Sequence, residues 1–203
     1  MIDILNSFDF GSLVTAVVLI VIALLLIRSI RIIPQATAGV VERLGRFHKV
    51  LNAGVNLVFP FIDVIRRTID LREQVVDFRP QSVITEDNLV VSIDTVIYYQ
   101  VTDSKSATYE INNFVLGIEQ LTVTTLRNVV GSLDLEKALT SRDTINKALR
   151  SVLDEATGKW GVRVNRVEIR DIVPPESVRD SMEKQMKAER EKRASILLAE
   201  GTK

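Results

Sequence analysis

The segment LVVSIDTVIYYQV, residues 89–101, alternates between two sets of side chains along its length. One set contains Val91, Ile93, Thr95, Ile97, Tyr99 and Val101. The other set contains Val90, Ser92, Asp94, Val96, Tyr98 and Gln100. A period of two, with many β-branched and aromatic residues, predicts a long β-strand. The Glu86-Asp87-Asn88 sequence in front of it predicts a turn.

Several short strands are expected upstream of this strand, in residues 34–88. This region is rich in β-branched residues, and turn formers interrupt it at Gly39, Gly45, Gly54, Pro60 and Pro80. Such spacing is typical of short strands joined by turns.

Two helices are expected downstream. In residues 113–130, side chains recur at helical spacing at Phe114, Ile118, Leu121, Thr125 and Val129. The next helix is predicted to begin with a capping box of Thr140 and Asp143 and to end at Gly158. Its apolar stripe contains Ile145, Ala148, Leu149, Val152, Leu153 and Ala156.

A second long strand is predicted at residues 161–172. Val162 and Val164 share one phase and Val167 and Ile169 the other, which indicates a bulge near Asn165–Arg166. Because two helices precede it, this strand must pair non-locally. Strands, two helices and a returning strand predict a compact α+β domain over residues 34–173.

Residues 10–33 are predicted to form a transmembrane anchor. No residue from Phe10 to Ile27 is charged, and eighteen helical residues span roughly 27 Å, close to the thickness of the hydrocarbon core. The aliphatic side chains make insertion favourable by on the order of 4–7 kcal/mol. A cleaved export signal would begin with basic residues, and a buried helix would have a polar face; neither feature is present. The anchor residues singled out are Leu13, Val17, Ile20, Leu24 and Ile27.

The charges on either side of this segment predict its orientation. Asp3 and Asp9 precede it, whereas basic residues follow it. The positive-inside rule then predicts that the tail, residues 1–9, lies outside the cell, so that a single-pass protein has its main domain in the cytoplasm. Contact with anionic lipid headgroups and ordinary solvation both stay open for Arg28, Arg31, Arg43 and Arg46.

A second apolar cluster occupies residues 55–62. It is too short to span a membrane and contains a proline. Two interpretations stay open: a core strand followed by a turn, or a second membrane contact beside the anchor. The residues for the second interpretation are Phe59, Pro60, Phe61 and Ile62.

The C-terminal region, residues 174–203, predicts a long charged helix. Acidic residues precede basic ones by four positions, as in Glu189 and Arg193, and apolar positions are sparse. Either a solvated rod or one helix of a multi-helix wall is compatible with this pattern. The chain ends without a stop signal, so we expect a longer helix. The residues expected at an oligomer contact are Val178, Met182, Met186, Glu189 and Arg193.

Composition and motifs argue against most chemistry. Twenty-six basic and 26 acidic residues give no net charge, which argues against a nucleic-acid partner. Without cysteine and with His48 alone, the usual zinc site cannot be built. No nucleotide-binding or nucleophile-elbow motif is present, so no cofactor, metal or catalytic residue is expected. A Ser-Lys pair stays open by inventory.

The order of these features resembles the stomatin/prohibitin superfamily, whose shared domain is called SPFH or Band 7, and is most similar to bacterial stomatin-like proteins (slipins). The resemblance rests on AGVVERLGRFHKVLNAGVNLVFPFID, IDLREQVVDF, VITEDNLVVSIDTVIYYQVTD, residues 120–172 and AEREKRASILLAEG. It implies a mixed sheet with packed helices, an N-terminal anchor, and a C-terminal helix that continues into a coiled coil.

The resemblance also implies a function. Such proteins are non-enzymatic scaffolds that form rings or cages, mark out membrane microdomains, and hold or regulate membrane proteins. Their partners include membrane-bound proteases and small proteins with a nodulation-formation-efficiency-type (NfeD-type) domain. We therefore expect a membrane-anchored homo-oligomeric scaffold. Two alternatives are a Ser-Lys peptidase and a monomeric membrane adaptor.

Overall fold

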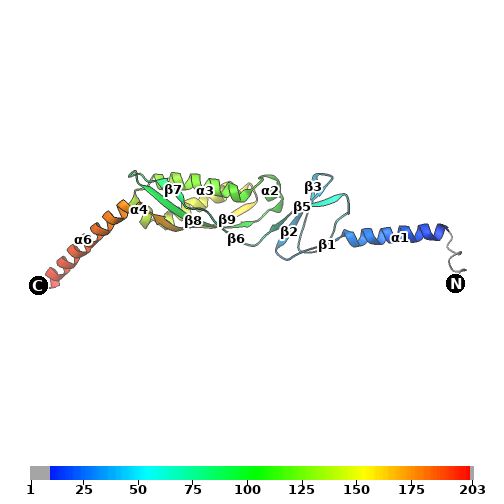
Figure 1. Cartoon of the computed structure of the whole chain (residues 1–203), viewed down its shortest axis with the longest axis horizontal. Coiled ribbons are helices and arrows are strands. Elements are labelled where there is room, and N and C mark those ends of the chain that lie inside the picture. The colour runs from blue at the N-terminus through cyan, green and yellow to red at the C-terminus, as the bar shows by residue number, and fades with distance from the viewer. Residues whose placement is uncertain (1–9, 202–203) are drawn as a thin grey trace. The chain divides into compact units, whose positions relative to one another are not determined.

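The computed structural model describes residues 10–201, and it describes side chains throughout that range except at 10–12, 182, 185 and 197–201. The chain forms two compact units. Unit 1 comprises residues 10–73, 100–112 and 160–162, and unit 2 comprises 74–99, 113–159 and 163–201. Both contain strands and helices (Figure 1), so the predicted α+β class is confirmed. The predicted range 34–173 contributes to both units.

Unit 1 contains two small antiparallel sheets. Its elements are α1 (Phe10–Ser29), β1 (Ile30–Ile33), β2 (Thr37–Arg43), β3 (Arg46–Leu51), β4 (Gly54–Leu57), β5 (Asp63–Asp70) and α2 (Ser104–Tyr109). Strand β1 pairs with β4, and β2 lies between β3 and β5. Their shared core consists of Ile33, Val41, Leu51 and Val58, with Ile65 packed against it.

The structure corrects the predicted extent of the apolar helix. Residues 10–33 do not form one helix, because α1 ends at Ser29 and residues 30–33 form a strand. Ile33 then turns into the core of unit 1 and is 6% exposed. The pairing of β1 with β4 provides backbone hydrogen-bond partners that a continued helix would have found within itself.

Unit 2 is organised around one long strand. Its strands are β6 (Gln74–Asp77), β7 (Gln81–Ile84), β8 (Val90–Val101) and β9 (Val162–Val173). Its helices are α3 (Phe114–Gly131), α4 (Leu135–Thr140), α5 (Arg142–Gly158) and α6 (Glu176–Gly201). Strand β8 pairs with β6, β7 and β9, which confirms the predicted non-local pairing. The ends of β8 and β9 at Gln100–Val101 and Val162 belong to unit 1.

The alternation that predicted β8 is confirmed by its burial. The six residues from Val91 to Val101 in the first set are all buried, and those of the second set are exposed or half-buried. Burial in β9 also changes phase between Val164 and Val167, as its sequence predicts. A turn closed by the Asn88 amide, which donates to the carbonyl of Thr85, leads into β8.

Both predicted helices form, but one predicted cap is wrong. The hydroxyl of Thr140 belongs to the last turn of α4 and donates to the carbonyl of Glu136 at 2.8 Å. Ser141 precedes α5 and makes no side-chain capping bond. A short helix that the sequence pattern did not reveal therefore takes the residue predicted to cap the next one. Helix α5 ends at Gly158 as predicted.

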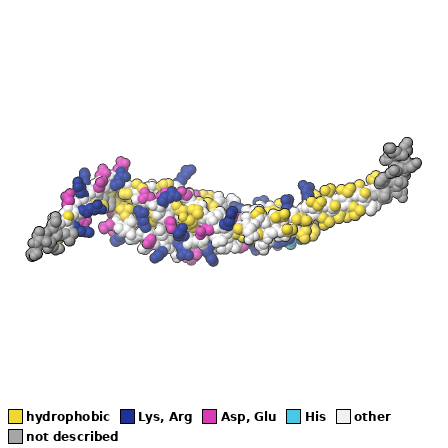
Figure 2. All heavy atoms as spheres, turned by 90° about the horizontal axis from the view of Figure 1, so that it is seen from below, with side chains coloured by type: hydrophobic (Ala, Val, Ile, Leu, Met, Phe, Trp, Pro, Cys, Tyr) yellow, Lys and Arg dark blue, Asp and Glu magenta, His cyan; other side chains and the backbone are white. Residues whose placement is uncertain are grey.

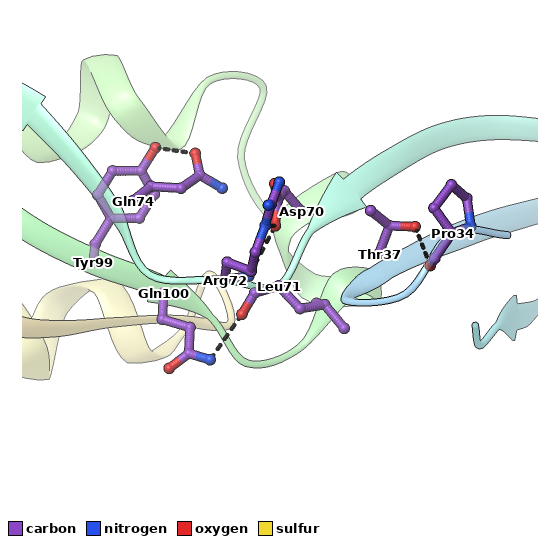
Figure 3. Close-up of polar contacts among 8 residues, drawn as sticks. All are labelled: Pro34, Thr37, Asp70, Leu71, Arg72, Gln74, Tyr99 and Gln100. Carbon is purple, nitrogen blue, oxygen red and sulfur yellow. Dashed lines mark hydrogen bonds and ion pairs between the residues drawn. The ribbon is translucent and has the colours of Figure 1, made fainter.

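Each unit has side-chain hydrogen bonds near residues 73 and 74, where the chain passes from unit 1 to unit 2 (Figure 3). Within unit 1, the amide of Gln100 donates to the carbonyl of Leu71 at 2.7 Å, and Arg72 pairs with Asp70. Within unit 2, the hydroxyl of Tyr99 donates to Gln74 at 2.9 Å. Neighbouring residues of β8 therefore bond to different units.

Candidate membrane-contact surface

Helix α1 exposes apolar side chains on all sides. The five predicted anchor residues, from Leu13 to Ile27, are between 51% and 70% exposed. Exposing such a side chain rather than burying it costs about 1.5–3 kcal/mol. Hydrophobic atoms cover this helix in Figure 2, whereas charged side chains are frequent over α6.

In the part of the chain that the structure describes, no helix meets the combined length and apolarity needed to cross a membrane.

The ribbon of β1 and β4 continues the apolar surface beyond α1. Ile30 lies opposite Leu57, and Ile32 lies opposite Val55. Because alternate residues of a strand share a face, these four side chains lie together on one side of the ribbon. All four are exposed, with Ile32 at 74%.

The loop from Val58 to Asp63 is held firmly against the end of α1. The Val58 amide donates to the carbonyl of Ser29 at 2.8 Å, and the buried Ser29 hydroxyl donates to the carbonyl of Val58 at 2.9 Å. The amide of Asp63 donates to the carbonyl of Phe59, and the amide of Phe59 donates to the carboxylate of Asp63, both at 3.0 Å. These bonds define the conformation of the loop.

This loop presents the second predicted cluster to the outside. Phe59, Phe61 and Ile62 are exposed and Pro60 is half-buried, with Phe61 at 84%. Val58 is buried in the core of unit 1. The core-strand interpretation therefore accounts for Val58 but not for the residues after it. Membrane contact by these residues stays a prediction.

Two exposed apolar residues beside one another have left-handed backbone. Phe61 has φ +72°, and Leu44, in the β2–β3 turn, has φ +49°. The amide of Leu44 donates to the carbonyl of Ile62, so the turn lies beside the loop. A left-handed conformation costs a residue other than glycine roughly 1–2 kcal/mol. Both positions therefore carry backbone strain, and both present an apolar side chain to the outside.

Asp63 is the residue that holds this surface together. Its carboxylate accepts two hydrogen bonds from the Arg43 guanidinium, at 2.7 and 3.0 Å, and its side chain is fully buried. These bonds, together with that from the Phe59 amide, lower the pKa of Asp63 to about 2 despite its burial. The same guanidinium lies 5.4 Å from the centre of the Phe59 ring.

The four predicted headgroup residues therefore differ from one another. Arg28, Arg31 and Arg46 are exposed. Among the described residues, none of these three has an ion-pair partner. Arg43 is instead engaged by Asp63. The sequence does not reveal this pairing, because the two residues lie on different strands and twenty positions apart.

The predicted oligomer contact lies on α6. Val178 is half-buried, whereas Met186, Glu189 and Arg193 are exposed. The Arg193 guanidinium donates to Glu189 at 2.9 Å, so this predicted pair forms within the helix. The side chain of Met182 and the tail at residues 1–9 lie outside what the structure describes.

His48, the one histidine of the sequence, is exposed on strand β3. Across the described residues, no group of three or more His, Cys, Asp or Glu side chains is placed to hold a metal ion.

Comparison with known proteins gives the same family as the sequence patterns. The family model described as SPFH domain / Band 7 family matches residues 31–203. An uncharacterized protein of Mycobacterium tuberculosis is 59% identical over 194 residues, which are 95% of this chain and 51% of that protein. An uncharacterized protein of Methanocaldococcus jannaschii is 44% identical over 184 residues, 91% of this chain and 92% of that protein.

A named relative is more distant. Human stomatin-like protein 2, mitochondrial, is 40% identical over 171 residues, 84% of this chain and 48% of that protein. The chain thus spans about half the length of the mycobacterial and human relatives. The observed mixture of strands and helices agrees with the fold that the family resemblance implies. The chain belongs to the SPFH domain / Band 7 family.

Proposed function

We propose that this protein is a membrane-attached scaffold of the stomatin/prohibitin type that associates with its own copies and confines membrane proteins. The observation that carries the proposal is the apolar surface of unit 1. It consists of α1, the β1–β4 ribbon, the turn at Leu44 and the loop at residues 58–63. Exposed apolar surface of this extent is typical of a protein or membrane contact.

A bilayer fits this surface better than a protein groove. Helix α1 is apolar on every side, so a groove would cover one face and leave the others in water. Exposed Arg28, in the last turn of α1, and Arg31, in β1, lie where the headgroup layer of a membrane would begin. We place α1 in the bilayer, and the rest of unit 1 against its cytoplasmic surface.

Three more specific parts of the proposal, on topology, assembly and partners, follow from the family resemblance. They are a single-pass topology with residues 1–9 outside, a homo-oligomeric ring or cage with contacts along α6, and partners such as membrane-bound proteases or NfeD-type proteins. Met186, Glu189 and Arg193 are exposed on α6 and are accessible to a second copy. A monomer mass for the detergent-extracted protein would favour the adaptor alternative.

Attachment is tested with charged substitutions in α1. In cells producing the full chain, the double variant Leu19→Arg, Leu24→Arg should move from the alkali-resistant membrane fraction to the soluble fraction. Each arginine near the centre of a membrane helix costs about 2.5–3.5 kcal/mol. Leu116→Arg is the matched control, because Leu116 is similarly exposed but lies on α3. Unchanged fractionation of the double variant would overturn the attachment.

Topology is tested by cysteine labelling, since the chain has no cysteine of its own. A membrane-impermeant maleimide should label Asn6→Cys in intact cells and Ser132→Cys, in unit 2, only after permeabilisation. Protection of both cysteines in intact cells would contradict a single pass and place α1 in one leaflet.

A further inference from the structure

A pocket at the base of α1 combines apolar walls with unpaired positive charge. Its volume is about 450 Å³, and its lining includes Arg28, Arg31, Val58, Phe61 and Val64. This lies within the range of roughly 300–1,000 Å³ that is typical of small-molecule sites. The pocket lies wholly within unit 1.

The net charge of the pocket is positive, because the acidic residue in its lining is already paired with an arginine. Asp63 is the acidic residue of its lining, and Arg43 already neutralises it through two hydrogen bonds. Arg28 and Arg31 have no acidic partner among the described residues. The negative end of the α1 dipole, equivalent to about half a charge, offsets a quarter of these two positive charges. The pocket therefore favours an anion.

Hydrogen bonds connect the segments that line the pocket. The Ser29–Val58 hydrogen bonds hold the end of α1 to one wall, and the Asp63–Phe59 bonds hold the loop that forms another. Phe61 and Val64 line the same pocket as the two arginines, and their side chains are exposed. A ligand that matches this lining combines an anionic group with hydrocarbon.

We propose that this pocket binds one anionic phospholipid, with its phosphate at Arg28 and Arg31 and the start of its acyl chains along Phe61 and Val64. Guanidinium groups bind phosphate through charge-assisted hydrogen bonds. A zwitterionic lipid carries its own cation and leaves the charge of the pocket uncompensated. The inference deepens the proposed membrane attachment, because it adds lipid selectivity at a defined site.

The test uses the full chain in a neutral maltoside detergent and native mass spectrometry with added short-chain phosphatidylglycerol. We expect saturable retention of one lipid per chain, and weaker retention of phosphatidylcholine. The double variant Arg28→Gln, Arg31→Gln should weaken phosphatidylglycerol binding by about ten-fold or more. Val64→Glu should also weaken it, since it places an acid on the apolar wall.

A matched control removes the same charge elsewhere. Arg127 and Arg150 are exposed in unit 2, on α3 and α5. The variant Arg127→Gln, Arg150→Gln should bind the lipid as the unaltered chain does. Equal weakening by both double variants would show general charge attraction and overturn the pocket. Displacement of the lipid by inorganic phosphate or glycerol 3-phosphate at equal concentration would overturn the lipid as ligand.

Failure of the pocket is distinguishable from failure of membrane attachment. Flotation with phosphatidylcholine liposomes measures attachment through the apolar surface of unit 1 when no anionic lipid is present. A chain that floats without retaining one phosphatidylglycerol keeps the proposed attachment and loses the pocket. A chain that retains the lipid in detergent without floating keeps the pocket and loses the attachment.

Discussion

At the scale of single residues, Leu44 occupies a hairpin-turn position at which asparagine is the favoured residue. Leu44 and Gly45 both have positive φ in a tight hairpin turn, where Asn-Gly is favoured. Leu44→Asn should therefore stabilise unit 1 by about 0.5–1 kcal/mol while weakening liposome binding. Urea denaturation followed by the fluorescence of Trp160, the one tryptophan, measures the first effect, and flotation measures the second. A loss of stability with unchanged binding would contradict a binding role for Leu44.

Because of Asp63, the free energy of unfolding of unit 1 is expected to depend on pH in the acidic range. The pKa of Asp63 is lowered to about 2 in the folded chain, against about 3.9 in an unfolded one. Its contribution is complete above the unfolded value and is lost as pH falls from about 4 to about 2. Urea denaturation over this range should show stability falling with pH.

Removing the Asp63 carboxylate tests the cause of that dependence. Asp63→Asn should lower stability at pH 7 by about 1–3 kcal/mol and flatten the acid dependence. Asp70→Asn is the control, because its pair with Arg72 is exposed and a surface pair is worth about 1 kcal/mol or less. Equal losses for both variants would contradict the role given to Asp63.

At the scale of elements, one glycine connects the start of β9 to the end of β8. The carbonyl of Gly161 accepts hydrogen bonds from the amides of Thr102 and Asp103 at 2.8 and 3.0 Å. Gly161 has φ +66°, and an added Cβ would lie 2.5 Å from the carbonyl oxygen of Asp103. Gly161→Ala should therefore destabilise unit 1 by about 2–4 kcal/mol.

The control for this substitution lies three residues earlier. A Cβ at Gly158, the last residue of α5, would meet no atom within 4 Å. Gly158→Ala should leave stability unchanged or raise it by up to about 1 kcal/mol. Thermal unfolding by circular dichroism, with Trp160 fluorescence for unit 1, compares the two variants. Similar unfolding temperatures would show that the backbone at Gly161 relaxes without cost.

At the scale of the whole molecule, attachment and assembly are expected to depend on different elements. Proline inside a helix costs about 3 kcal/mol, so Ala188→Pro should interrupt α6 without altering α1. We expect the detergent-extracted variant to have a smaller mass by mass photometry while remaining in the membrane fraction. Ala188→Ser is the control. An unchanged assembly for the proline variant would remove α6 from the proposed contact between copies.

Periodicity along the chain was enough to predict the long elements β8, β9, α3 and α5, whereas the family was inferred from the resemblance of several sequence stretches. The burial of β8, the return of β9 and the end of α5 at Gly158 were all readable, because spacing records which face of an element is buried. The apolar cluster at 55–62 was identified as well, but its two interpretations could not be separated. Short helix α4 was missed, because its six residues give too few repeats of a helical pattern.

The sequence alone determined the α+β class, the apolar character of residues 10–27 and the charge that follows them. Only the tertiary structure showed that α1 stops at Ser29, that Arg43 is used by Asp63, and that Leu44 lies beside the Phe59–Ile62 loop. The physical reason is the range of the interactions. Periodicity reports local burial, whereas strand pairing and buried ion pairs join residues far apart in the chain.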